Sequence, residues 1–416
     1  MEEVSWLARV GRASWFSTMK KNRPVFRSSV AVLSVCGLQF LSLTFLYENA
    51  RAQSATPTPT PPPVGGKFDW TNLQSDIAGV ADRTDPHLVN PWGLTINPVN
   101  VKKNAFWISD NNSGFSTLYT LDGAAVPLVV TIPPTSADPG PNPIANPTGI
   151  VVNTSKTEFI LTEDNQPAAF IFDGEDGSIT AWNGGLNPIT MAVLKVDNSS
   201  SDPTKSSVYK GLALATRTSG GLTLYATNFH NGTVDVYDNT FKKATISGTF
   251  RDPGPLPTLP PGAVGWAPFG IANIDGVLFV TFAAQNSVKH DDVAAPGSGF
   301  VDIFDTEGNF MERLVTGGEL NSPWGLAEVP SKFGGLVPET LLVGNFGDGH
   351  INAYDIKTKK FLGQLFHRKG QPLQFNGLWS LLFVESRLYF TAGINNESDG
   401  DFGFIVPSSK EDTGGF

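Results

Sequence analysis

The stretch Asn90-Pro91-Trp92-Gly93-Leu94 has a near copy, Ser322-Pro323-Trp324-Gly325-Leu326, far along the same chain. Four further stretches resemble this pair: NPTGIVVN from Asn146, VYKGLALAT from Val208, APFGIANID from Ala267 and FNGLWSLLF from Phe375. Aligned on Trp92, they make Thr148, Lys210, Phe269, Trp324 and Asn376 equivalent, at intervals of 52 to 62 residues. A period of this length indicates a repeat architecture.

Each repeat contains short runs in which apolar and polar residues alternate. Alternation with period two is typical of half-buried strands. The third repeat shows four such runs: GLALAT (211–216), LTLYATN (222–228), GTVDVYD (232–238) and KATISGTF (243–250). Four strands per repeat and six repeats predict an all-β fold, a six-bladed β-propeller of four-stranded blades.

The sixth repeat ends without a recognisable fourth strand. A candidate for the missing strand lies before the first repeat, at 67–75. We expect this N-terminal segment to fill the outer position of the last blade. That pairing closes the ring and removes an exposed strand edge.

The first 52 residues have the features of an N-terminal extension plus a signal peptide. A basic run at Lys20–Arg23 precedes an apolar stretch, Val30–Leu46, and a small-residue site at Ala50–Ala52. This order predicts a secretory signal with cleavage after Ala52, and Met19, directly before the basic run, is a candidate start. The alternative is that the apolar stretch is retained as a membrane anchor.

Residues 53–66 are rich in Pro and Thr and are expected to form a linker to a single domain at 67–416. The protein is then exported, and is secreted or held in the periplasm or cell envelope. The single cysteine, Cys36, lies in the leader, so the mature chain has neither a disulfide nor a cysteine nucleophile. The net charge of -10 without a basic stripe argues against nucleic acid and anionic membranes as partners.

Acidic and amide side chains recur at the end of the second strand of several repeats. A gapless alignment makes Asp173, Asn228 and Asn345 equivalent, and Asp110 matches them in the first repeat with one extra loop residue. Oxygen ligands of this type suit Ca²⁺ or Mg²⁺, so a metal ring at the pore is one interpretation. The alternative is ordinary turn chemistry, because Asp and Asn with a following Gly favour hairpin turns.

Other candidates lie where the first strand of a repeat begins. Asn90, Asn146 and Asn321 stand before it and either bind a ligand or start a turn. Trp92 and Trp324 are either buried wedges or an aromatic platform for a small molecule, glycan or protein.

His230 and Glu175 are weak candidates for a catalytic base, since the sequence identifies no partner for either. The loop 285–298 contains Lys289-His290-Asp291-Asp292 and is a candidate lid over the pore. The linear motifs of serine hydrolases, HExxH metalloproteases and P-loop proteins are absent from the sequence.

Several motifs in order resemble a family of uncharacterised exported bacterial β-propeller proteins, some of which carry a PEP-CTERM sorting signal. The motifs are NPWGL, PTGIVVN, FIFDGEDGSITAWN, VYKGLAL, LYATNFHNGTVDVYD, GFVDIF and SPWGLA, within residues 67–405. More distantly the chain is similar to NHL-repeat propellers, to lactonases with a divalent metal in the pore and to streptogramin lyases. The resemblance implies a propeller and export, and no established activity.

The leading hypothesis is therefore a secreted propeller that binds a ligand or partner on the loop face around its pore. The competing hypothesis is a divalent-metal-dependent hydrolase or lyase, with Asp110, Asp173, Asn228 and Asn345 as ligands and His230 or Glu175 as base. A structural component of the cell envelope is a third class.

Overall fold

The computed structural model describes residues 60–136, 145–202 and 204–409. Residues 1–52 and the first half of the linker lie outside these residues. Apart from Thr60, the described residues belong to the unit Pro61–Phe416, and the following description concerns this unit. Its described helix is a single 3-10 turn, η1 (Val101–Lys103), and no described helix is long and apolar enough to cross a membrane.

Strands that are close in sequence pair into antiparallel sheets, in agreement with the predicted all-β fold. The first is β3 (Pro91–Ile96), β4 (Phe106–Asp110), β5 (Phe115–Tyr119) and β6 (Val130–Thr131). The second is β7 (Pro147–Val152), β10 (Phe170–Gly174), β11 (Ser178–Trp182) and β12 (Val193–Asp197). The third is β13 (Tyr209–Thr216), β14 (Leu222–Asn228) and β15 (Thr233–Tyr237). The fourth is β16 (Gly265–Ile274), β17 (Val277–Gln285), β18 (Phe300–Phe304) and β19 (Phe310–Thr316).

The last two repeats share one continuous sheet. Its order is β20 (Pro323–Glu328), β21 (Thr340–Asn345), β22 (Ile351–Asp355), β23 (Phe361–His367), β1 (Pro63–Ser75), β26 (Asp401–Pro407), β25 (Arg387–Ala392) and β24 (Leu378–Val384). The short β2 (Arg83–Thr84) adds to β1, and β8 (Ile160–Leu161) pairs with β9 (Gln166–Pro167).

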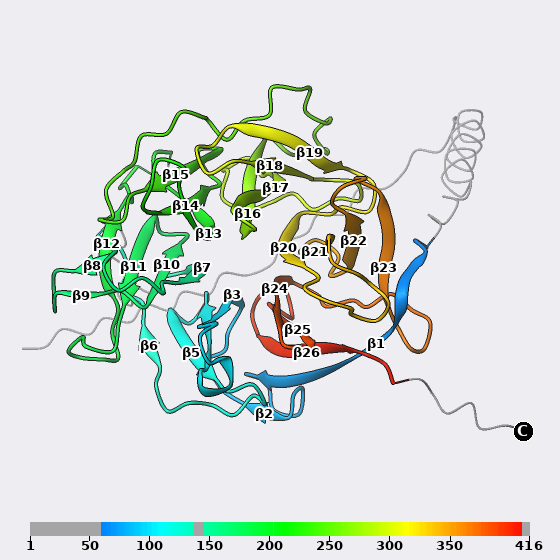
Figure 1. The fold of residues 1–416 in the computed structure, drawn as a ribbon, viewed down its shortest axis with the longest axis horizontal. Helices are drawn as coiled ribbons and strands as arrows, with labels where there is room; N and C mark the ends of the chain where they lie inside the picture. Colours follow the sequence, from blue (N-terminus) through cyan, green and yellow to red (C-terminus); the bar gives the residue numbers. More distant parts are fainter. Residues whose placement is uncertain (1–59, 137–144, 203, 410–416) are drawn as a thin grey trace, which may run out of the picture. The chain divides into compact units, whose positions relative to one another are not determined.

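The inner strands of the repeats follow one another around a centre. In contact order they are β3, β7, β13, β16, β20 and β24, and β24 touches β3 again. Figure 1 shows these strands around the middle of the unit, with the other strands of each sheet further out. The arrangement is propeller-like. Aromatic side chains stack between neighbouring sheets, and the ring centroids of Trp107 and Phe170, for example, are 4.1 Å apart.

The N-terminal strand joins the two ends of the chain, as the sequence predicted. From Phe68 to Ser75, β1 runs antiparallel to β26, with Trp70 opposite Ile405. Its first residues, Pro63–Phe68, instead lie parallel to β23 (Figure 1). The strand begins before the expected residue 67, because it also covers the edge of β23.

A close backbone contact joins successive inner strands. A Cβ atom on Gly93 would lie 2.5 Å from the carbonyl oxygen of Thr148, and one on Gly211 would lie 3.0 Å from that of Phe269. Only glycine leaves room for a backbone at this distance. The same contact joins Gly270 to Trp324 and Gly325 to Trp379. The glycine of the repeated motif is therefore required by the packing of one repeat on the next.

The sixth repeat has a different register from the one predicted. Gly325 meets the carbonyl oxygen of Trp379, so Trp379 and not Asn376 is the equivalent of Trp92. The assignment of Asn376 was wrong because the Gly-Leu pair that suggested it lies too early, and β24 begins only at Leu378.

The fourth strand predicted for the third repeat, 243–250, is also absent from the described strands. Ala244 donates to Val236, but the segment then turns away, and the amides of Gly248 and Phe250 donate to Glu307 and Gly308 of the next repeat. The segment thus pairs with β15 only at its start, and the amides of residues 248–250 are satisfied by a turn of the fourth sheet.

Phe68 offers a test of the role of β1 in closing the sheet. Its side chain is 0% exposed and packs against Phe333, with ring centroids 5.1 Å apart. We expect Phe68→Ala to cost about 3–5 kcal/mol of unfolding free energy, measured by urea denaturation. Trp70→Ala on the same strand is the control and should cost clearly less, because Trp70 is 42% exposed. Equal losses would contradict this role of Phe68.

Asp401, which pairs with Ser75 across β1 and β26, provides a test by pH. Burial raises the pKa of its carboxyl group from 3.8 to about 8. Since the folded-state pKa is the higher one, the stability that this group contributes is complete below pH 3.8 and is lost as the pH rises through 8. Between pH 5 and pH 9 the urea midpoint should fall more in the parent than in Asp401→Asn. Identical profiles would show that Asp401 is ionised in the folded protein.

Candidate functional site

Aromatic side chains gather where the inner strands begin. The rings of Trp92 and Trp379 stack with their centroids 3.4 Å apart, and Phe346 stacks on Trp379 at 4.1 Å. Trp324 lies edge-on to Trp92 at 6.0 Å, and Phe269 completes the group. We call these five residues the aromatic plug. Both tryptophans of the opening motif are therefore packed together in one cluster.

The plug forms the floor of a cavity of about 260 Å³, which we call the mouth cavity. Four plug residues line it, and Trp324 instead faces a hollow of about 160 Å³ between the inner strands. The remaining lining is polar: Asn111, Asn112, Glu175, Lys210, His290, Asp291, Asp292 and Glu397. The cavity thus combines an apolar floor with polar walls in which four carboxyl groups face one lysine and one histidine.

Lys210 occupies the position of Trp92 in the third repeat and is buried in the plug. Its side chain is 3% exposed, and its ammonium group lies 5.1 Å from the ring centroid of Trp92. It forms an ion pair with Glu175 and lies 3.7 Å from Asp291 Oδ1. Burial alone would lower the pKa of Lys210, but these carboxylates outweigh it and raise the pKa. Lys210 is therefore charged.

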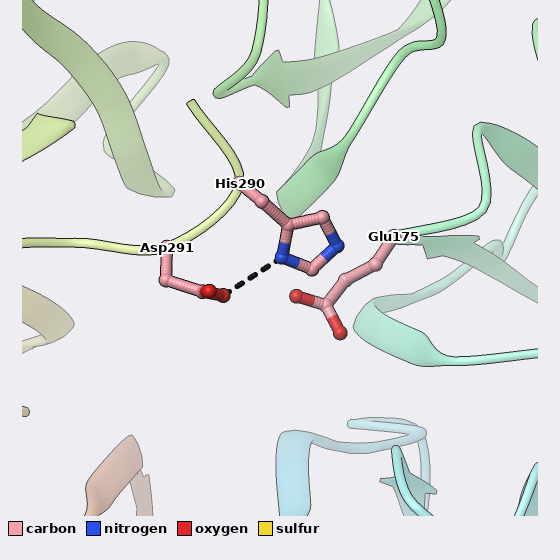
Figure 2. A group of neighbouring side chains, drawn as sticks. All are labelled: Glu175, His290 and Asp291. Carbon is pink, nitrogen blue, oxygen red and sulfur yellow. Dashed lines mark hydrogen bonds and ion pairs between the residues drawn. The ribbon is translucent and has the colours of Figure 1, made fainter. Parts of the chain in front are cut away.

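His290 and Asp291 come from the long loop between β17 and β18, which the sequence analysis identified as a candidate lid. His290 Nδ1 lies 2.7 Å from Asp291 Oδ1, and Figure 2 shows the Glu175 carboxylate beside the imidazole. The bond to Asp291 raises the pKa of His290, and in return it lowers the pKa of Asp291 to about 2. The pair fixes the orientation of the imidazole at the rim of the cavity.

Two further carboxyl groups, those of Asp292 and Glu397, face the same cavity, and both have a raised pKa. Burial raises the pKa of Asp292 more than the nearby Ser322 hydroxyl and the charge of Lys210 lower it. Burial also raises the pKa of Glu397, with repulsion from Glu175 and Asp292 adding to it. The mouth cavity therefore holds more acidic groups than its cations balance.

Asparagines hold the rim together. Asn90 accepts a hydrogen bond from the indole of Trp379 at 3.0 Å and donates to Glu397 Oε2 at 3.0 Å. Asn111 donates to Glu175 Oε2 at 3.0 Å, and Asn112 to the carbonyl oxygen of Glu397 at 2.6 Å. Glu397 is the last of three consecutive residues with positive φ, a conformation unfavourable for glutamate. Its place at the rim depends on these bonds.

The structure brings some of the sequence-predicted ligand-binding residues to the mouth. Trp92 lines the mouth cavity. Asn90 and Asn146 do not line it but bond to residues that do: Asn90 to Trp379 and Glu397, and Asn146 to the carbonyl oxygen of Asn111 at 3.3 Å. Trp324 supports the site from below by donating its indole N–H to the carbonyl oxygen of Lys210 at 2.8 Å. Asn321 is not among the cavity residues; its carbonyl oxygen accepts the amide of Gly347.

Of the four residues of the predicted metal ring, neither Asp110 nor Asp173 belongs to the group of described His, Asp and Glu side chains that could share a metal ion. Asn228 donates to Ser207 and Asp235, both at 2.9 Å, within its own repeat. Asn345 likewise donates to the carbonyl oxygen of Glu319 at 2.7 Å. These amides connect the second strand of a repeat to the loop before its first strand.

Asp173 and Asp110 differ from the asparagines in other ways. Asp173 pairs with Ile179 across its hairpin. The equivalent pair of the third repeat is Thr227 with Val234, so Asp173 corresponds to Thr227 and not to Asn228. The gapless alignment was wrong by one residue here, because this hairpin is shorter. Asp173 Oδ1 accepts from Thr148 and from the amide of Gly149, although burial still raises its pKa to about 7.

Asp110 is fully buried, and burial raises its pKa well above the usual range. Neither of its carboxylate oxygens has a hydrogen-bond partner among the described residues. Of the two weak candidates for a base, His230 contacts the carbonyl oxygen of Thr204 at 3.2 Å, while Glu175 lines the mouth cavity.

Sequence reasoning missed several residues of the site. Lys210 was recognised as the equivalent of Trp92 but not as a site residue, although a lysine at an aromatic inner position was a usable signal. Trp379 was hidden by the misaligned sixth repeat. Glu397 and Asn112 lie in loops without a repeated pattern, so no signal could have identified them.

The chain was compared with known proteins, and no family model matches it. Two uncharacterised proteins of Acanthamoeba polyphaga mimivirus are similar in sequence. One is 29% identical, over 79% of this chain and 82% of its own length. The other is 28% identical, over 80% of this chain and 78% of its own length. Because these relatives are viral, membership of an exported bacterial family remains a prediction.

Among solved structures, virginiamycin B lyase from Staphylococcus aureus is 13% identical, with 82% of this chain and 99% of that chain covered and a TM-score of 0.43. The soluble aldose sugar dehydrogenase from Escherichia coli is 12% identical, with 82% and 100% covered and a TM-score of 0.47. None of these names assigns an activity to this chain.

Proposed function

We propose that the protein is an exported six-bladed propeller that binds a small molecule, or an exposed group of a glycan or protein, in the mouth cavity. The observation that carries the proposal is the buried pair of Lys210 and Glu175 beside this cavity. The six inner strands support the blade count, and the leader sequence supports export.

The buried pair is difficult to explain by stability alone. Taking an ammonium and a carboxylate out of water costs several kcal/mol per ion, and well-packed apolar residues often serve stability equally well. Trp92, Phe269, Trp324 and Trp379 are such residues, and they occupy the equivalent position in four other repeats. A lysine there, at the edge of a cavity with oriented polar groups, is typical of a binding site.

A second candidate function follows from Figure 2. Glu175, His290 and Asp291 each offer a ligand atom within 4.8 Å of the others, as a divalent metal such as Ca²⁺ or Mg²⁺ would require. A metal there would supply the cofactor of a hydrolase or lyase. However, the ammonium group of Lys210 contacts both Glu175 and Asp291 and occupies the position of a cation between them. We therefore favour binding over metal-dependent catalysis.

Lys210→Met tests the binding function. A melting screen of the full chain with neutral sugars, carboxylates and amines should reveal ligands that stabilise the parent, by about 2.7 kcal/mol at a hundred times the dissociation constant. Sugars or carboxylates that stabilise the parent should not stabilise Lys210→Met. Lys210→Met and Glu175→Gln each leave one partner of the pair without its counter-charge and should each lose about 3–5 kcal/mol, so every ligand shift is measured against the variant's own melting temperature. A panel that stabilises neither protein, or both equally, would contradict the proposal.

Metal addition tests the second candidate. We expect Ca²⁺, Mg²⁺ and EDTA to leave the melting temperature of the parent unchanged, because Lys210 already neutralises the acidic group. Lys210→Met removes the competing ammonium and should become metal-sensitive. A metal-dependent shift in the parent that Asp291→Asn abolishes would favour the metal-dependent function instead.

A further inference from the structure

We propose that the ligand of the mouth cavity is an organic ammonium ion, with Asp292 and Glu397 as the carboxylates that face its charge. This inference rests on the proposed binding function and adds the chemical class of the ligand. It follows from the charges, the aromatic floor and the unpartnered polar atoms of the cavity.

Two of the four carboxyl groups of the cavity have a cationic partner among the described residues, and two do not. Lys210 forms its ion pair with Glu175, and His290 is bonded to Asp291. Asp292 and Glu397 form no ion pair with a described residue, although both are partly buried and lie near the other acids. Among the described residues, the carboxylate of Glu397 accepts a hydrogen bond from the neutral amide of Asn90. A cation that enters the cavity would meet two carboxyl groups that have no cation of their own.

The floor of the cavity favours an organic cation over a metal ion. Trp92, Phe346 and Trp379 present aromatic surface to the space between the acids. Lys210 already places an ammonium group 5.1 Å from the ring centroid of Trp92 and 5.9 Å from that of Phe229, so this surface accepts a positive charge. Aromatic walls attract ammonium ions but cannot supply the oxygen ligands that Ca²⁺ and Mg²⁺ need.

Two unpartnered polar atoms point to a ligand independently of the charges. Asp292 Oδ2 is buried and has no well-aligned hydrogen-bond partner among the described residues, although the Ser322 hydroxyl lies near enough to lower the pKa of Asp292. The indole N–H of Trp92, a residue only 2% exposed, likewise has no acceptor in the described part of the chain. Buried polar groups are almost always hydrogen-bonded in folded proteins. A ligand with an ammonium group and a nearby hydroxyl oxygen would satisfy both.

There is also room for a substituent on such a ligand. Phe346 and Glu397 line a second hollow of about 490 Å³ as well as the mouth cavity. This hollow is lined further by Asn395, Asn396 and Gly347. An ammonium group beside Glu397 could therefore carry a polar chain that extends between these residues.

Calorimetric titration of the full chain tests the ligand class. The probes are choline, ethanolammonium and spermidine, with 3,3-dimethylbutan-1-ol as the uncharged analogue of choline. We expect at least one ammonium probe to bind, and the uncharged analogue not to bind. Glu397→Gln and Asp292→Asn should each weaken that binding by about tenfold or more. Glu385→Gln, which changes an exposed carboxylate paired with Lys102, should leave it unchanged.

The outcomes separate this inference from the proposed function. If no ammonium probe binds, or if the uncharged analogue binds as well as choline, the ligand class is wrong. Should neutral sugars or carboxylates then stabilise the parent but not Lys210→Met, the binding function would stand without it. Ammonium binding that survives in both Glu397→Gln and Asp292→Asn would also overturn the inference, because the charge would be recognised elsewhere.

Discussion

The architecture depends on one backbone contact, in which the carbonyl group of one inner strand packs against a glycine of the neighbouring inner strand. Gly93 meets Thr148 in this way, and Gly325 meets Trp379. The last repeat closes on the first by a different bond, since Thr391 Oγ1 donates to the carbonyl oxygen of Trp92 at 2.6 Å. Because any larger side chain would separate the strands, this contact sets how closely the inner strands approach one another.

The same contact determines where the site forms. The residue whose carbonyl group meets the glycine also places its side chain at the end of the inner strands, so these side chains meet one another. Phe269, Trp324 and Trp379 are such residues and belong to the plug. Trp92 and Lys210 take the equivalent position in their own repeats, where their carbonyl oxygens instead accept hydrogen bonds from Thr391 and Trp324, and Lys210 is charged. A lysine at this position is forced against aromatic rings and out of water. Its charge is then stabilised by Glu175 and Asp291, which come from two different loops.

Much of the fold could be predicted because its signals are local. The alternation of apolar residues identified most strands, and the missing fourth strand of the sixth repeat identified the pairing of residues 67–75 with the end of the chain. The errors arose where a local pattern competed with packing between repeats. Residues 243–250 alternate like a strand, but their amides bond to Glu307 and Gly308 of the next repeat.

The candidate site was less predictable for a related reason. Four residues look equivalent in sequence: Asp110, Asp173, Asn228 and Asn345. The hairpin after Asp173 is shorter by one residue than the one after Asn228. Because strand side chains alternate between faces, this difference gives Asp173 other partners. Sequence alone determined the repeats and most of the strands, since each depends on residues that are neighbours in the chain. Only the tertiary structure decided that Lys210, Glu175, Asp292 and Glu397 share one cavity, because four separate repeats contribute them and no spacing in the sequence records the distance between repeats.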